Sequence, residues 1–237
     1  MGFPISQRFP ILLPNGTLDQ LLCLSEKNKP PLEWTDTKKI IIIFGIASAM
    51  KYLHSKSIMH GNLKPSNILL DANYYPKIFD FYNSFDEKNS SKFPISSNNQ
   101  SPIYTAPEFY WENEITKSGD VFSFGMIVYE IISNKKPFLN EQPFMIQQKI
   151  ASGERPDFNE KINDSFKELI ESCWCDNPSE RLSFENIVTQ LKENDDFCEK
   201  SINRDEFNQY VDSFKRKRIS PKKFIPDKIQ VVTSIPT

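Results

Sequence analysis

Apolar residues recur at helical spacing along much of this chain. The longest example lies in residues 36–53, where one broad side is apolar (Ile40, Ile43, Phe44, Ala47, Met50 and Tyr52). Residues three or four positions apart share one face of an α-helix, so this spacing predicts a helix with one buried side. Similar patterns predict helices in residues 18–24, 121–133, 143–152, 164–173, 184–193 and 204–214.

Strand signals are few and short, and they lie at residues 9–13, 57–59, 68–70 and 77–78. Pro14-Asn15-Gly16 is typical of a turn. Thr17, with Gln20 three positions later, forms a capping box that predicts the start of the first helix. Residues 89–101 are rich in Ser and Asn without periodicity, which predicts a mobile loop. The whole pattern predicts a mostly helical domain with small hairpins near its middle.

The composition is that of a soluble globular protein, with 38% hydrophobic residues, 25% charged residues and a net charge of −2. This charge balance predicts no general attraction to nucleic acid or to anionic membranes. The four cysteines and two histidines lack the spacing of a disulfide framework or a zinc site. The amino terminus lacks a signal-peptide pattern, and the apolar run in residues 40–50 is too short to span a membrane. These features predict a cytoplasmic protein.

Two motifs carry the most information about chemistry. Residues 60–67 (His-Gly-Asn-Leu-Lys-Pro-Ser-Asn) and residues 80–82 (Asp-Phe-Tyr) resemble the catalytic loop and the metal-binding triplet of eukaryotic protein kinases. Residues 106–108 (Ala-Pro-Glu) resemble the end of the family's activation segment, and residues 120–125 (Asp-Val-Phe-Ser-Phe-Gly) resemble its central buried helix. Gly153-Glu154-Arg155-Pro156 and Cys173-Trp174 are similar to the tyrosine-kinase-like group of Ser/Thr kinases, and residues 101–105 to a Ser/Thr-type substrate-binding loop.

The resemblance implies an α+β, mostly helical fold, namely a protein-kinase-like large lobe with the small lobe absent. The chain's seven glycines never form Gly-x-Gly, so a Gly-rich phosphate lid is not expected. Because the composition becomes more charged after Glu193, we predict a kinase-like domain in residues 1–195 and a charged, partly disordered tail in residues 196–237. The basic cluster in residues 215–223 is interpreted as a solvated end, with a nuclear import or phosphate-binding patch as the alternative, which would make the protein nuclear.

The resemblance also assigns roles to individual residues. Asn67 and Asp80 match the residues that hold magnesium through oxygen ligands, although Asn67 alternatively only braces the loop backbone. Lys64 matches the lysine that contacts the transferred phosphoryl group, and the alternative is a solvated surface lysine. Leu69 matches the residue beneath the adenine ring.

Asn62 departs from the family at the position of the catalytic aspartate. A carboxamide accepts a hydrogen bond but cannot take the proton of a substrate hydroxyl, and general base catalysis typically contributes roughly 10²–10⁴-fold. Gly61 replaces the arginine that pairs with a phosphorylated activation loop in many kinases. Tyr82 replaces a glycine whose backbone freedom lets the triplet change conformation, so Asp80 and Phe81 are expected to stay in one state.

Five further residues are expected to support the architecture. His60 and Phe81 match a stacked apolar spine, and Asp120 matches the residue that accepts amide hydrogen bonds from the catalytic loop. Glu108 and Arg181 are expected to form a buried ion pair.

We interpret the chain as a catalytically impaired pseudokinase fragment that acts in binding or scaffolding, with no cofactor predicted. The first alternative is a Ser/Thr protein kinase that uses ATP and magnesium and whose small lobe is missing from this chain. A weaker alternative is a nuclear or nucleic-acid adaptor that acts through the basic tail. The expected partner is a protein or a second copy of the chain, with no membrane partner and nucleic acid disfavoured.

The predicted partner site is an upper face on which residues 68–70 and Phe81 form an apolar patch, because soluble monomers seldom leave such patches bare. The other expected cover is the tail folding back over this face through Phe214, Phe224 and Ile225.

Overall fold

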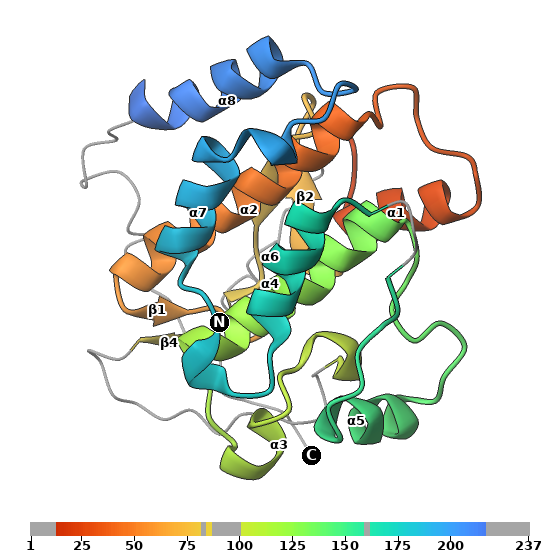
Figure 1. The fold of residues 1–237 in the computed structure, drawn as a ribbon, viewed down its shortest axis with the longest axis vertical. Coiled ribbons are helices and arrows are strands. Elements are labelled where there is room, and N and C mark those ends of the chain that lie inside the picture. The colour runs from red at the N-terminus through yellow and green to blue at the C-terminus, as the bar shows by residue number, and fades with distance from the viewer. Residues whose placement is uncertain (1–12, 82–83, 87–100, 159–161, 217–237) are drawn as a thin grey trace, which may run out of the picture.

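The computed structural model describes residues 13–81, 84–86, 101–158 and 162–216, and the fold is mostly helical (Figure 1). The helices are α1 (Leu18–Glu26), α2 (Asp36–Ser55), α3 (Phe109–Glu112), α4 (Lys117–Ser133), α5 (Pro143–Ala151), α6 (Asp164–Trp174), α7 (Phe184–Glu193) and α8 (Arg204–Arg216). The predicted helices are confirmed, and the capping box of Thr17 and Gln20 begins α1 as expected. Helix α4 begins at Lys117 rather than Val121, because the Thr116 side chain accepts a hydrogen bond from the Gly119 amide and caps it.

The strands pair as two small antiparallel sheets. Strands β2 (Ile68–Leu70) and β3 (Pro76–Ile78) form the predicted hairpin, with Leu69 opposite Lys77. Strand β1 (Ile58–Met59) pairs with β4 (Phe85–Asp86), a strand that the sequence pattern did not predict. The segment 60–67 between β1 and β2 is therefore fixed at both ends by strands.

Helix α4 is the centre of the core. Nearly every residue from Asp120 to Ile131 on this helix is buried, including Phe122 and Phe124, which are fully inaccessible. It contacts both α2 and α6 (Figure 1). A helix that is apolar on all sides needs neighbours on all sides, and this packing provides them.

Helix α2 is buried more completely than its sequence pattern indicated. The four isoleucines at residues 40–43 are at most 1% exposed, because α4, α7, β3 and α8 all pack against this helix. Tyr52, which we counted with the apolar side, is 61% exposed instead. The expectation for Tyr52 was therefore wrong, because a side chain two residues after the buried Met50 points to the opposite side of the helix.

The segment after residue 195 is part of the same core. Helix α8 lies across α2, with Phe207, Tyr210 and Val211 buried in the contact (Figure 1). The predicted helix in residues 204–214 is confirmed, and its first half belongs to the globular unit. The domain boundary near residue 195 stays a prediction.

The predicted apolar patch on the upper face needs correction. Ile68 and Leu70 are fully buried, while Leu69 is half-buried and Phe81 is 43% exposed. Successive residues of a strand point to opposite faces, so Ile68 and Leu70 enter the core and only Leu69 faces away from it. Phe214 does fold back, but it packs against Phe44 of α2.

Several predictions fall outside the described residues: most of the strand at residues 9–13, the conformation of Tyr82, the loop at 89–101 apart from Ser101, Phe224, Ile225 and residues 217–223 of the basic cluster. Within the described residues, no helix is both long and apolar enough to span a membrane.

Candidate functional site

The loop of residues 60–67 is held in place by the carboxylate of Asp120. One carboxylate oxygen accepts a hydrogen bond from the His60 amide at 2.8 Å, and the other accepts one from the Gly61 amide at 2.9 Å. Gly61 has a φ of +70°, which allows the loop to turn sharply toward α4. Asp120 is only 2% exposed, so the predicted role of this residue as an acceptor for the loop is confirmed.

His54 is a further partner of Asp120 that our sequence analysis missed. Its Nε2 lies 2.9 Å from Asp120 Oδ2, and it reaches this point from the last turn of α2. The sequence did carry a signal, because His54 is one of two histidines and closely precedes the loop. Helix α2, the loop and helix α4 are thus joined at one buried carboxylate.

His60 connects the loop to the triplet at residues 80–82. Its Nε2 lies 3.0 Å from the carbonyl oxygen of Phe79, and its Nδ1 lies 3.2 Å from the Asn62 amide nitrogen. A carbonyl only accepts and an amide N–H only donates, so His60 is neutral with its proton on Nε2. Burial lowers the pKa of His60, which agrees with this state. The Phe81 ring lies 5.1 Å from the His60 ring, as the predicted spine requires.

Asn62 and Asp80 face each other across the site. The Asn62 side-chain amide donates to the Asp80 carboxylate at 3.4 Å, and Asn62 is 8% exposed whereas Asp80 is exposed. Asp80 has a φ of +63°, which is uncommon for a residue other than glycine and indicates a locally strained backbone. This conformation turns the carboxylate toward the loop.

The remaining predicted site residues lie around this pair. The Asn67 side-chain amide donates a hydrogen bond to the backbone carbonyl of Asn62 at 2.8 Å. This is the contact with the loop backbone that we considered as the alternative to metal binding. Lys64 is half-buried at the start of the turn Pro65–Asn67. Leu69 lies in the neighbouring hairpin and bridges to Thr17.

A small cavity of about 30 Å³ opens beside the loop, lined by Asn62, Lys64, Ser101 and Thr105 among others. This volume accommodates little more than one or two water molecules. Within the described residues, the face formed by the loop of residues 60–67 and residues 101–105 therefore carries a small cavity at this point.

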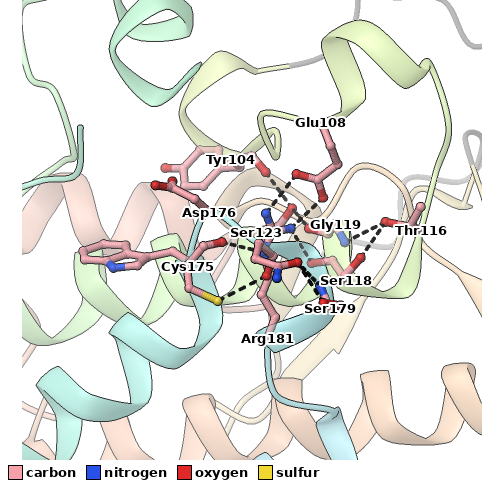
Figure 2. A network of polar contacts seen from close by, with 12 residues as sticks. Tyr104, Glu108, Thr116, Ser118, Gly119, Ser123, Cys175, Asp176, Ser179 and Arg181 are labelled. Atoms are coloured by element: carbon pink, nitrogen blue, oxygen red, sulfur yellow. Dashed lines mark hydrogen bonds and ion pairs between the residues drawn. The ribbon is translucent and has the colours of Figure 1, made fainter. Parts of the chain in front are cut away.

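The ion pair between Glu108 and Arg181 lies on the buried side of this face and supports it (Figure 2). The guanidinium contacts both carboxylate oxygens, at 2.6 and 2.9 Å, and both residues are buried. Arg181 also donates to the carbonyls of Ser118 and Cys175, at 3.1 and 2.9 Å. The predicted pair is confirmed, and it links the segment after residue 105 to the start of α4 and the end of α6.

Residues 101–105 are fixed by a buried pair that our sequence analysis also missed. The Tyr104 hydroxyl donates to the Glu130 carboxylate on α4, and the Ser123 hydroxyl donates to the Tyr104 carbonyl at 2.6 Å. Burial raises the pKa of Glu130 to about 7 and raises the pKa of Tyr104 further above its ordinary value. A glutamate in the middle of an apolar helix was the available sequence signal.

Comparison with known proteins identifies the class. Residues 12–191 match the family described as protein kinase domain. Because this match covers most of the chain, and because the loop, triplet and ion pair lie as described, the chain belongs to the protein kinase family.

The relatives include Ser/Thr kinases of much greater length. A LIM domain-containing serine/threonine-protein kinase of Dictyostelium discoideum is 33% identical over 181 residues, which are 76% of this chain and 18% of the relative. A serine/threonine-protein kinase/receptor of Acanthamoeba polyphaga mimivirus is 33% identical over 172 residues, 71% of this chain and 10% of the relative. The RGS domain-containing serine/threonine-protein kinase A of Dictyostelium discoideum is 33% identical over 155 residues, which are 65% of this chain and 14% of the relative. The chain thus spans under a fifth of the length of these relatives.

Proposed function

We propose that this chain is a catalytically impaired protein kinase domain of the tyrosine-kinase-like group that binds a protein partner on the face formed by the catalytic loop and residues 101–105. The observation that carries this proposal is the contact between the Asn62 amide and the Asp80 carboxylate. The group at the catalytic position is a hydrogen-bond donor to Asp80 and cannot accept a proton from a substrate hydroxyl.

The same contact bears on metal binding. A carboxylate at position 62 would be a second negative charge near Asp80 and would favour a cation between the two. The neutral Asn62 amide instead donates a hydrogen bond to the Asp80 carboxylate, so no cation is needed to balance a second charge. The Asp80 carboxylate and the Asn67 carboxamide oxygen still offer the hard oxygen ligands that magnesium prefers, so the residues present fit such an ion. Magnesium, when bound, would supply positive charge beside a nucleotide phosphate.

Binding of a protein partner is favoured by the shape and rigidity of the face. The cavity beside Asn62 and Lys64 is small, and Tyr104 is fixed by Glu130 and Ser123. A preorganised surface loses little conformational entropy when a partner binds.

The second candidate is a Ser/Thr protein kinase within a longer protein. It is favoured by the backbone conformation of Asp80, by the packing of the Phe81 ring against His60 and by the similarity to Ser/Thr kinases. In that case ATP and magnesium would be the cofactors. Because Asn62 cannot act as a general base, activity would depend on substrate positioning and electrostatic stabilisation.

A thermal shift titration with millimolar ATP and magnesium tests whether this chain itself binds the nucleotide. We expect no rise in the melting temperature of this chain, because Asp80 is exposed and the sequence contains no Gly-x-Gly lid. A ligand at a hundredfold excess over its Kd would stabilise the native state by about 2.7 kcal/mol. A rise of several degrees that disappears in Asp80→Ala would favour the second candidate, and so would phosphorylation of a generic substrate after Asn62→Asp alone.

Partner binding is tested with an immobilised random peptide library. Lys64→Glu reverses a charge on the proposed face, whereas Lys192→Glu reverses one on the exposed side of α7. We expect selected peptides to lose binding to the first variant only. Equal binding to both variants would place the partner elsewhere.

A further inference from the structure

Helix α8 lies beyond residues 12–191, the part of the chain that matches the kinase family. It nevertheless packs against α2 and adds buried residues to the core of the lobe. Phe207, Tyr210 and Val211 are 3–7% exposed. The polar residues Asn208 and Gln209 between them face solvent. The helix thus presents one apolar side, which packs against the lobe, although Phe214 near its end stays 43% exposed.

The first contact of α8 is an aromatic cluster on α2. The Phe44 ring lies edge-on to the rings of Phe207, Tyr210 and Phe214, at centroid distances of 5.6, 6.3 and 5.9 Å. Edge-to-face pairs of this kind add to the stabilisation that burial gives.

The second contact joins α8 to the hairpin of β2 and β3. The Tyr210 ring lies 4.4 Å from the ring of Tyr75, which is in the turn of that hairpin. The Tyr210 hydroxyl and the Pro76 ring converge on Gly45 of α2, where an added Cβ would be 2.3 Å from the hydroxyl oxygen and 2.5 Å from Pro76 Cγ. Three elements therefore meet at one glycine that has no room for a side chain.

A charged side chain ties the same elements together at the edge of the cluster. Lys38 on α2 forms an ion pair with Glu206 on α8 at 2.6 Å, and its ammonium group lies 5.5 Å from the centre of the Tyr75 ring. The Asn203 amide just before α8 donates to the Thr37 side chain at 2.8 Å. The start of α8 is thereby fixed to α2.

The turn that α8 contacts is under backbone strain. Tyr74 has a φ of +62°, which is unfavourable for a bulky side chain, and its ring is buried at 9% exposure. Such a conformation persists only when the surrounding packing enforces it. Tyr210 provides part of that packing through the adjacent Tyr75.

The hairpin in turn leads into the candidate site. Strand β2 contains Leu69. Directly after β3, the Phe79 amide donates a hydrogen bond to the Asn67 carbonyl at 3.1 Å, which connects this segment to the loop of residues 60–67. Asp80 follows directly. We propose that α8 is a clamp that fixes the β2–β3 hairpin, with Tyr210 as the positioning residue, so that release of α8 loosens the hairpin and the strand that leads to Asp80. This function is independent of whether the domain transfers phosphate.

Hydrogen exchange on the full chain tests the clamp, with Tyr210→Ala as the variant and the exposed neighbour Gln209→Ala as the control. The hairpin amides of residues 68–78 should exchange at least about tenfold faster in Tyr210→Ala, because opening of a local unit becomes easier while the rest stays closed. Amides of α6 should exchange as in the unmodified chain, and Gln209→Ala should change neither. Unchanged hairpin exchange, or an equal increase in α6, would overturn the proposal.

Gly45→Ala gives a second test that does not depend on the stability of Tyr210→Ala. Helix propensity alone predicts a higher melting temperature for alanine in the middle of α2. The clamp predicts a lower melting temperature and faster hairpin exchange, because the new methyl group would displace Tyr210 and Pro76. A raised melting temperature with unchanged hairpin exchange would contradict the clamp.

Discussion

Two parts of the chain, helix α2 and the loop of residues 60–67, converge on the buried carboxylate of Asp120 on α4, and this single residue explains much of the site's geometry. His54 from α2, His60 and Gly61 from the loop all direct an N–H or ring nitrogen at it. In the same way, the Asn62 side-chain amide donates to the Asp80 carboxylate. At the scale of residues, the site is therefore an arrangement of two carboxylates and the groups that satisfy them.

Glu130 allows a prediction about pH at the same scale. Burial raises its pKa in the folded state to about 7 from an ordinary value of 4.5. Between these pH values the folded state holds a proton that the unfolded state has lost, so the contribution of Glu130 to stability is greatest below pH 4.5 and falls as the pH rises through 7. The change amounts to up to about 3 kcal/mol for a shift of this size.

Glu130→Gln removes this titration, so we expect the loss of stability between pH 5 and pH 7.5 to become smaller. Urea unfolding at both pH values measures it, with the exposed Glu112→Gln as the control. An unchanged pH dependence in Glu130→Gln would contradict the assignment.

At the scale of elements, the ion pair of Arg181 and Glu108 joins segments that are far apart in the sequence. Arg181 lies before α7, Glu108 lies before α3, and the guanidinium also satisfies carbonyls at the start of α4 and the end of α6 (Figure 2). The ion pair with Glu108 and the hydrogen bonds from Arg181 to the two carbonyls together hold the segment of residues 101–108 against the core. The face proposed for partner binding depends on this support.

Arg181→Ala should destabilise the fold by about 3–5 kcal/mol, because it leaves the Glu108 carboxylate buried without a partner. The double variant Glu108→Leu/Arg181→Met should be less destabilised than Arg181→Ala, since it removes both charges and fills the space. Urea unfolding of the two variants measures the difference. A double variant as unstable as the single would indicate that the carbonyl contacts of Arg181 matter more than its charge.

At the scale of the whole molecule, the chain folds as one unit from α1 to α8 within the described residues. Helix α4 runs through the middle, α2 lies against it, and α8 covers the far side of α2 (Figure 1). The buried aromatic residues of α8 cover Phe44 of α2, which would otherwise be exposed to solvent. The lobe and the first part of its predicted tail thus share one core.

A chain that ends after Asn203 should be less stable than one that ends after Arg216 by more than about 3 kcal/mol, because three buried side chains of α8 are lost. The shorter chain should also bind a dye that reports apolar surface and should associate, as measured by light scattering. A stable, monomeric shorter chain without dye binding would show that α8 is dispensable and that the boundary lies near residue 195.

The sequence by itself determined the features that depend on neighbouring residues. Thr17 and Gln20 begin α1, Ser183 caps α7 where the pattern predicted a helix, and the motifs at residues 60–67 and 80–82 indicated the protein kinase family. Hydrogen bonds between residues three or four apart are formed locally, so short stretches of sequence are sufficient to indicate them. The roles of Asp120 and of the Glu108–Arg181 pair were also predictable, but only through the resemblance.

Only the tertiary structure decided which surfaces these elements share. Alternation along β2 buried Ile68 and Leu70, which corrects the predicted patch. The contact of His54 with Asp120, the pairing of Tyr104 with Glu130 and the meeting of Tyr210, Pro76 and Gly45 join residues that are distant in the sequence. No local pattern encodes such contacts, because they arise only when the packing of whole helices brings the side chains together.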